Sequence, residues 1–292
     1  MFTLTLSSSY QSWGMGHLDR DTDEIAECAR YVQACKTAKY QSVDGNKLVI
    51  MGHSTGSQDI LHYLYRPISH TSSPSFDRSL EHTVRPAVDG AIMQAPVSDR
   101  ECIHWVLKHG FLGRTSDELQ KVYDTLLAIA NASSREADAS HQPESTFDVI
   151  LPIALTSQLG YPANTPLSAR RFLSLVSPSS PASPSEDDLF SSDLSPERLA
   201  STFGMIGKRG LLRKTLLVLP SGADQAVPEW VDKDVLLKRW RAAADAGGVS
   251  NVWDSLSGPI PGASHALSDE DQAGPRKILV ERVVQYLKKV EA

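Results

Sequence analysis

The sequence is short of the features that mark several classes of protein. Its 292 residues include only three cysteines, Cys28, Cys35 and Cys102, with no C-x-x-C pair and no histidine spacing suited to zinc. We therefore expect reduced thiols rather than a disulfide framework. The N-terminus lacks the basic and apolar segments of a signal peptide, and no run approaches the ~18 apolar residues of a membrane span. These absences predict a cytoplasmic protein with no membrane span.

Positive charge is also scarce. The formal net charge is −6, so the chain offers no basic field of the kind that binds a nucleic-acid backbone. Hydrophobic residues make up 41% of the chain, which is enough to bury a sizeable core at this length. We expect a globular protein whose partner is a small molecule and not a nucleic acid. The sequence carries no signal for the oligomeric state.

Short apolar runs alternate with helical patterns along the chain. The continuous apolar run 46–52 is typical of a central parallel strand, because both faces of such a strand are covered. Strands that alternate with helices predict a mostly parallel sheet. The expected strands are 2–6, 46–52, 88–98, 215–219 and 251–256, and the expected helices between and after them are 19–36, 58–65, 230–246 and 275–290.

A long insertion separates two of the expected strands. More than a hundred residues of different character lie between 88–98 and 215–219, with helical patterns over 103–112 and 118–130 and a Ser/Pro-rich segment at 176–188 that we expect to be mobile. We predict a core formed by 1–99 and 213–292. Residues 100–212 are expected to form a helical cap over one end of the sheet.

Gly52, His53, Ser54, Thr55 and Gly56 match the pattern G-x-S-x-G. The pentapeptide is a weak signal by itself, but here an apolar strand precedes it and a helical pattern follows, as a nucleophile elbow requires. We expect the serine to adopt strained dihedrals, and both glycines to be needed because the backbone crowds the turn. The motif predicts a nucleophilic serine.

A serine hydroxyl needs a histidine to take its proton and a carboxylate to orient that histidine. In α/β-hydrolases these residues follow in the order Ser, acid, His, each in a loop after a strand. Asp224 follows the strand "TLLVL", and His265 lies between the last expected strand and the last helix. The order predicts Ser54, Asp224 and His265 as a triad. Asp99, which follows the preceding strand, remains the rival acid. Four histidines on or beside the expected helices are expected to be packed or solvated: His53, His62, His104 and His109.

The tetrahedral intermediate also needs an oxyanion hole. The backbone N–H of Thr55 is one expected donor. In an α/β-hydrolase the Gly-rich loop that supplies the second donor precedes the strand corresponding to 2–6, so the N-terminal strands of the fold are expected to be absent from this chain. Either the sequence is an N-terminally short form, or another segment such as Ser7 to Tyr10 supplies the donor.

Several segments together resemble one hydrolase family. They are "SSSYQSWGMGHLDRDTDEI", "VIMGHSTGSQDILHYL", "AIMQAPVSDRE", "RFLSL" and "EDDLFSSDLS", and the resemblance runs from about Leu4 to the C-terminus. The sequence is similar to a fungal and plant α/β-hydrolase family of mostly uncharacterised proteins, whose known member class is the intracellular siderophore esterase that opens fusarinine C. The resemblance implies the same triad and a ferric hydroxamate siderophore as a candidate ester substrate.

The units of fusarinine C are joined by ester bonds, and each carries an amine that is cationic at neutral pH. Acidic residues of the expected cap, Glu186, Asp187, Asp188 and Asp193, are candidates to attract those amines. The alternative is a solvated acidic loop without a ligand. The aromatic residues Tyr10, Trp13 and Trp105 are candidates to line the substrate pocket, and the alternative for them is core or rim packing.

The sequence thus predicts an α/β-hydrolase fold and a serine esterase that forms an acyl-enzyme on Ser54. This chemistry needs no metal and no organic cofactor. Two other functions stay open. A general carboxylesterase or thioesterase would differ only in its pocket, and a non-catalytic protein of the same fold would bind a ligand without cleaving it.

Overall fold

The structure, a computed structural model, describes residues 2–40, 47–67, 84–140, 149–248 and 251–292. These residues form two compact units. Unit 1 takes its residues from 2–21 and 98–191, and unit 2 from 22–67, 84–97 and 192–292. This grouping places 2–21 with most of the insertion and 192–212 with the sheet, so it differs from the expected core and cap. The cap itself stays a prediction.

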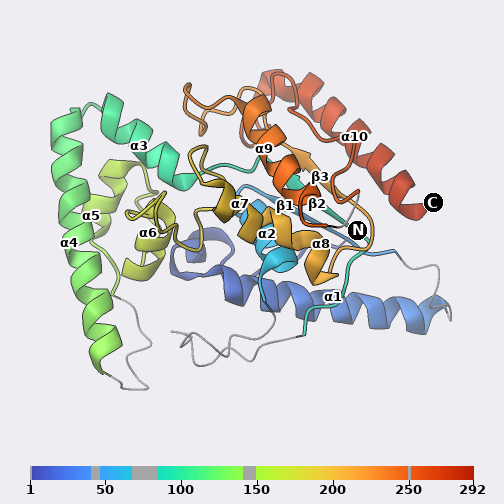
Figure 1. The fold of residues 1–292 in the computed structure, drawn as a ribbon. Helices are drawn as coiled ribbons and strands as arrows, with labels where there is room; N and C mark the ends of the chain where they lie inside the picture. Colours follow the sequence, from blue (N-terminus) through green and yellow to red (C-terminus); the bar gives the residue numbers. More distant parts are fainter. Residues whose placement is uncertain (1, 41–46, 68–83, 141–148, 249–250) are drawn as a thin grey trace. The chain divides into compact units, whose positions relative to one another are not determined.

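Unit 2 contains a parallel three-stranded sheet (Figure 1). Its strands are β1 (Val49–His53), β2 (Gly90–Gln94) and β3 (Leu216–Leu219), in the order β1-β2-β3, with Met51 paired to Ile92 and Ile92 paired to Leu217. Every residue of β2 and β3 is buried, as expected for uncharged strands covered on both faces. The prediction of an α/β fold with a parallel sheet and flanking helices is confirmed.

Strand β1 lies at an edge of this sheet. Among the described residues, only β2 pairs with it, and Met51 is 49% exposed. The prediction that the apolar run 46–52 forms a central strand is therefore wrong. An apolar run indicates a strand that can be buried on both faces, but it does not show whether neighbours are present to bury it.

Two other expected strands are also corrected. Residues 2–6 belong to no strand, and the N–H of Leu6 donates to Ser9 Oγ at 2.8 Å instead of to a sheet partner. Residues 251–256 follow β3 in parallel but form only isolated bridges, such as the one between Leu216 and Trp253. The side chain of Ser257 interrupts the ladder by accepting the N–H of Val218 at 3.0 Å.

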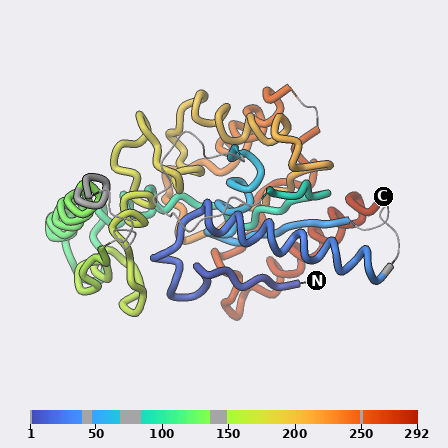
Figure 2. The backbone as a smooth tube through the Cα atoms, turned by 90° about the horizontal axis from the view of Figure 1, so that it is seen from below, coloured from blue at the N-terminus to red at the C-terminus, as the bar shows by residue number. Residues whose placement is uncertain are grey.

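The helices of unit 2 cover both faces of the sheet. Figure 2 shows α2 and α9 on one side of the strands and α10 on the other. Tyr286 of α10 packs on the sheet beside Ile92 and Leu217, and its hydroxyl accepts the N–H of Ala91 at 3.0 Å. The bounds are α1 (Leu18–Tyr40, which begins in unit 1), α2 (Thr55–Tyr65), α7 (Pro196–Ser201), η3 (Phe203–Met205), α8 (Ile206–Arg209), α9 (Lys233–Asp245), η4 (Glu270–Gln272) and α10 (Ala273–Glu291).

Side-chain caps mark several helix starts. The hydroxyl of Ser98 accepts the N–H of Glu101 at the start of α3, and the hydroxyl of Ser168 accepts the N–H of Arg171 at the start of α6. The carboxylate of Asp232 accepts two N–H groups at the start of α9. These caps satisfy donors that a helix leaves unpaired in its first turn. Local sequence therefore fixes where these helices begin.

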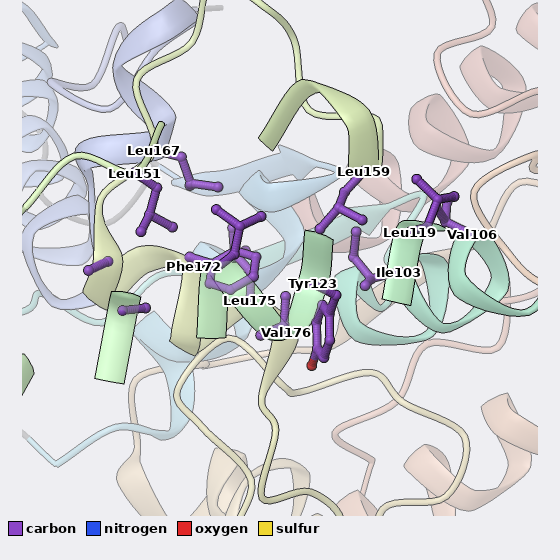
Figure 3. Close-up of a cluster of buried hydrophobic side chains, with 13 residues drawn as sticks. Ile103, Val106, Leu119, Tyr123, Leu151, Leu159, Leu167, Phe172, Leu175 and Val176 are labelled. Atoms are coloured by element: carbon purple, nitrogen blue, oxygen red, sulfur yellow. The ribbon is translucent and has the colours of Figure 1, made fainter. Parts of the chain in front are cut away.

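Unit 1 is helical and has its own core (Figure 3). Phe172 and Leu175 of α6 pack with Ile103 of α3 and Leu119 of α4. This confirms the two helical patterns expected in the first part of the insertion. The elements are η1 (Tyr10–Met15), α3 (Asp99–His109), α4 (Ser116–Ser140), α5 (Ile153–Thr156), η2 (Ser157–Leu159) and α6 (Ala169–Val176).

The Ser/Pro-rich segment 176–188 lies within the described residues. Ser177 and Ser180 hydrogen-bond to each other at 2.8 Å, and the N–H of Ser185 donates to Ser177 Oγ at 2.8 Å. The hydroxyl of Ser180 also donates to Asp188. The serines thus hydrogen-bond within the segment, and its expected mobility stays a prediction.

No helix in the described ranges combines the length and the apolar character needed to cross a bilayer.

Candidate active site

Ser54 stands in a sharp turn between β1 and α2. It is the N-cap of α2, with φ 55° and ψ −120°, which are unusual dihedrals for a residue other than glycine. Its N–H donates to the carbonyl of Gln94 at 3.1 Å, and its carbonyl accepts the N–H of Ser57 at 2.8 Å. The turn is therefore tied to β2 on one side and to the first turn of α2 on the other, and the serine takes the strained dihedrals that the motif predicts.

Only one of the two glycines in the motif is crowded. A Cβ on Gly52 would lie 2.0 Å from the carbonyl oxygen of Gly56, so this position admits no side chain without a shift of the turn. A Cβ on Gly56 would meet no described atom within 4 Å. The expectation that both glycines are needed is thus wrong for Gly56, because the helix turns its position 56 toward open space.

Three side chains from distant parts of unit 2 meet at this turn. His265 Nε2 lies 2.8 Å from Ser54 Oγ, and His265 Nδ1 lies 2.9 Å from Asp224 Oδ2. Asp224 follows β3, and its side chain is 1% exposed, whereas that of His265 is 19% exposed. Because a carboxylate only accepts, the proton of the neutral imidazole lies on Nδ1, which leaves Nε2 free to accept from the serine.

This arrangement is that of an activated nucleophile. A buried carboxylate holds one tautomer of the imidazole, and the imidazole can take the hydroxyl proton when the serine attacks. Asp99, the rival acid, is the first residue of α3 and belongs to unit 1. The catalytic roles of Ser54, Asp224 and His265 remain our prediction, now with a defined geometry.

The backbone of His265 has two further side-chain partners. Its N–H donates to Gln225 Oε1 at 3.0 Å, and its carbonyl accepts from His53 Nε2, also at 3.0 Å. The rings of His53 and His265 have centroids 5.0 Å apart. No motif in the sequence marks His53 or Gln225 as a site residue, and a packed or solvated role was expected for His53. The available signal was their position, since one precedes the serine and the other follows the aspartate.

Desolvation lowers the pKa of His53 below its ordinary value of 6.5. The hydrogen bond to the carbonyl of His265 and the charge of Asp224 act in the opposite direction, and repulsion from His265 when that ring is protonated adds to the lowering. His53 is an exposed residue, and its ring is tilted by 49° relative to that of His265. We therefore take His53 as neutral at neutral pH, with its proton on Nε2.

Thr55, the expected oxyanion donor, is the first residue of α2. The N–H groups in the first turn of a helix have no acceptor within the helix, and they carry the positive end of its dipole. The N–H of Thr55 directly follows the nucleophile, as the donor role requires. The expected second donor, in the segment Ser7 to Tyr10, belongs to unit 1, and its role stays a prediction.

The expected substrate-binding residues also belong to unit 1. Tyr10 is 82% exposed, Trp13 packs with its ring centroid 6.0 Å from that of Tyr161, and Trp105 lies 4.8 Å from the ring of His109. Exposure leaves Tyr10 open to a ligand, whereas Trp13 contributes to the packing of unit 1. Their roles in binding stay predictions.

Asp187 and Asp188 are buried, unlike residues of a solvated acidic loop. Arg171 Nη1 lies 2.6 Å from Asp187 Oδ1, and Arg100 Nε lies 3.0 Å from Asp188 Oδ2, with all four side chains nearly inaccessible to solvent. Their charges are thus paired within unit 1. A role in attracting cationic amines stays a prediction, and the ion pairs themselves support a structural role.

Neither unit, taken by itself, contains a candidate metal site among its described residues. Such a site would need at least three ligand atoms from His, Cys, Asp or Glu close together in one unit. The hydrogen-bonded series from serine to aspartate is sufficient for nucleophilic catalysis without a metal. The expectation that no cofactor takes part stays a prediction.

Comparison with known proteins gives consistent similarities. The family described as "Protein of unknown function (DUF1749)" matches residues 1–288. The chain is 61% identical over 288 residues to the fusarinine C esterase sidJ of Aspergillus fumigatus, covering 98% of this chain and 79% of that protein. It is 47% identical over 299 residues to an esterase of Emericella nidulans, covering 100% of this chain and 78% of the relative.

A solved structure is similar as well. The siderophore hydrolase EstB from Aspergillus fumigatus superposes with a TM-score of 0.79 at 55% sequence identity. The match covers 98% of this chain and 79% of that one. Similarity at this level extends through both units and is not limited to the G-x-S-x-G turn.

Proposed function

Because this chain belongs to the family described as a protein of unknown function (DUF1749), and esterases are among its similar relatives, we propose that it is a serine esterase of fusarinine C-type siderophores. It acts on carboxylic ester bonds of a small molecule. The observation that carries the proposal is the hydrogen-bonded series that runs from Ser54 through His265 to Asp224.

In the first half-reaction, His265 Nε2 takes the proton of Ser54 Oγ while that oxygen attacks the ester carbonyl. The negative charge that develops on the carbonyl oxygen is stabilised by the N–H of Thr55. Asp224, buried against His265 Nδ1, stabilises the imidazolium that forms. The intermediate collapses when the leaving alcohol takes the proton from Nε2, which leaves an acyl group on Ser54.

In the second half-reaction, water replaces the alcohol. His265 Nε2 removes a proton from the water, which attacks the acyl carbonyl and passes through a second tetrahedral intermediate. Ser54 leaves with the proton from His265, and the carboxylic acid is released. In both halves His265 Nε2 transfers the proton and Asp224 holds His265 Nδ1, while water takes the place of the serine hydroxyl at Nε2 in the second half.

The substrate class follows from the relatives and from charge. A fusarinine C-type substrate carries ester bonds for the serine and amines that are cationic at neutral pH, and the chain has a net charge of −6. Its three cysteines are free, which suits a reducing compartment, and we place the reaction in the cytoplasm.

A labelling experiment tests the nucleophile. We expect a fluorophosphonate probe to modify the wild-type protein on Ser54 and not to modify Ser54→Ala. Labelling of neither protein would contradict the esterase proposal and favour a protein that binds its ligand without cleaving it. Labelling of both would place the nucleophile elsewhere.

A substrate panel tests the specificity. Hydrolysis of fusarinine C is compared with hydrolysis of simple acyl esters and thioesters by the same preparation, with Ser54→Ala as the blank. We expect kcat/KM to be highest for the siderophore. A preference for the simple esters or thioesters would instead identify a general carboxylesterase or thioesterase.

A further inference from the structure

The residue that moves the proton lies in a loop without regular secondary structure. Residues 261–269, which carry His265, belong to neither a helix nor a strand. Ser54 donates to one ring nitrogen and Asp224 accepts from the other, but these two hydrogen bonds do not fix the backbone that carries the ring. Catalysis depends on placement, and an error of about 1 Å can cost on the order of a hundredfold in rate. Other contacts must therefore hold this peptide in place.

The base of the loop is held by its neighbours. The N–H of Ala223 donates to the carbonyl of Ala263 at 2.8 Å, and Gln272 Oε1 accepts the N–H of Ser264 at 2.8 Å. Gln272 also donates from Nε2 to the carbonyl of Gly262 at 3.1 Å. These bonds fix the chain as far as the residue before His265.

At His265 itself, both backbone polar groups are bound by side chains. Gln225 Oε1 accepts its N–H, and His53 Nε2 donates to its carbonyl, each at 3.0 Å. Each of these side chains comes from a residue adjacent in sequence to another member of the triad. His53 precedes Ser54 and Gln225 follows Asp224, so the two contacts link the peptide of the base directly to the nucleophile turn and to the acid loop.

We propose that His53 and Gln225 are positioning residues that clamp the peptide of His265 between the serine turn and the aspartate loop. This inference rests on the proposed esterase function. The clamp sets the distance from His265 Nε2 to Ser54 Oγ by holding the backbone, and the triad hydrogen bonds then orient the ring. It predicts an effect on the chemical step and little effect on substrate binding.

The chemistry of the two groups is matched to this role. A carbonyl only accepts and a backbone N–H only donates, so position 53 needs a donor and position 225 needs an acceptor. A neutral imidazole supplies the donor at 53 without adding a positive charge 5.0 Å from a ring that becomes positive during the reaction. Glutamine supplies the acceptor at 225 without a charge.

Length-matched substitutions separate the hydrogen bond from the packing. Glutamine and methionine have similar length, but only glutamine carries a terminal donor and acceptor. His53→Gln retains a donor and His53→Met does not. Gln225→Glu retains an acceptor and Gln225→Met does not. The two His53 variants therefore differ chiefly in the hydrogen bond to the peptide of His265, and the two Gln225 variants differ in that hydrogen bond and in one negative charge.

The readouts are kcat, KM, the rate of fluorophosphonate labelling and Tm, measured on the full chain. We expect His53→Met and Gln225→Met each to lose about five- to tenfold in kcat and in labelling rate, the size of effect that one net hydrogen bond supplies. KM and Tm should stay close to wild type because substrate contacts and the core are unchanged. His53→Gln and Gln225→Glu should recover most of the loss.

The outcomes also distinguish this inference from the proposed function. If the wild type shows no labelling that depends on Ser54, the esterase proposal fails, and the clamp fails with it. If the wild type is labelled but both methionine variants react at the wild-type rate, the clamp alone is overturned. A loss of kcat that follows a fall in Tm, or that the conservative variants do not recover, would also overturn it.

Discussion

At the scale of single residues, the identity of the acid is the sharpest test of the site. Asp224→Asn would retain the size of the side chain but let His265 adopt the wrong tautomer, and kcat should fall by about 10⁴-fold. Asp99→Asn changes the first residue of α3 in unit 1 and should retain most of the activity. Hydrolysis assays of the two variants decide the point. The opposite pattern would assign the acid to Asp99.

His53 should make stability depend on pH. Desolvation lowers its pKa in the folded protein below the ordinary value of 6.5, so the unfolded chain binds the proton first as the pH falls. Its contribution to stability is therefore fully present above pH 6.5 and is lost as the pH falls through 6.5 toward the folded pKa. His265 and Asp224 are the ionisable groups that face it.

The measurement is Tm against pH for the wild type and for His53→Gln, which does not titrate. We expect Tm of the wild type to fall more steeply than that of the variant on the acidic side of pH 6.5, with parallel curves at higher pH. Curves that stay parallel over the whole range would mean that His53 titrates alike in the folded and unfolded protein.

At the scale of elements, the serine turn should tolerate a side chain at one glycine only. Gly52→Ala forces a Cβ against the carbonyl oxygen of Gly56, and we expect it to lower the free energy of unfolding by about 3 kcal/mol. Gly56→Ala lies within α2 and meets no described atom, so it should be neutral or stabilising by up to about 1 kcal/mol. Urea denaturation of both variants measures the difference. Equal losses would contradict the geometry of the turn.

The ion pair between α6 and the Ser/Pro-rich segment should matter for stability. Asp187→Asn removes the negative charge that lies 2.6 Å from the buried guanidinium of Arg171, and removal of one partner of such a pair typically costs about 3–5 kcal/mol. Asp193→Asn removes the same charge from an exposed position and is the matched control for stability. Denaturant unfolding and KM for a cationic ester are measured together. A raised KM at unchanged stability would instead support the role of Asp187 in attracting amines.

Periodicity predicted most elements because it reports burial. Apolar runs and turn residues predicted the fully buried strands β2 and β3 and the helices around them. They also predicted the order of the loops that carry the triad. The pattern failed at residues 2–6 because an extended segment becomes a strand only when a neighbour pairs with it, and no described segment does so.

The site was predictable only in part, for a similar reason. Ser54, Asp224 and His265 stand at fixed places relative to strands, and sequence order reveals such places. The contacts of His53 and Gln225 run from side chain to backbone across 212 and 40 positions, and no local pattern encodes them. The burial of Asp187 and Asp188 was hidden as well, because their countercharges are Arg171, 16 positions from Asp187, and Arg100 of α3, and no pattern within the acidic segment indicates them.

At the scale of the whole molecule, net charge should affect how substrates arrive. A chain with charge −6 attracts a cationic ester over a screening length of about 8 Å at physiological salt, and added salt shortens that range. We expect kcat/KM for an amine-bearing ester to fall as salt is raised, while that for a neutral ester of the same acyl group changes little. Initial-rate kinetics over a salt series test this. Equal salt dependence for the two esters would exclude steering by charge.

The dihedrals of Ser54 also bear on how the protein evolves. A residue other than glycine at φ 55° and ψ −120° costs on the order of 1–3 kcal/mol, whereas glycine adopts such a conformation readily. Selection for a stable fold alone would thus favour glycine at position 54, whereas the proposed role as nucleophile requires serine there. In a lineage that kept the fold to bind a ligand but no longer cleaved it, this serine would be among the first residues to be replaced. The residue found at the turn in a descendant would then record whether its ancestors were still selected as enzymes.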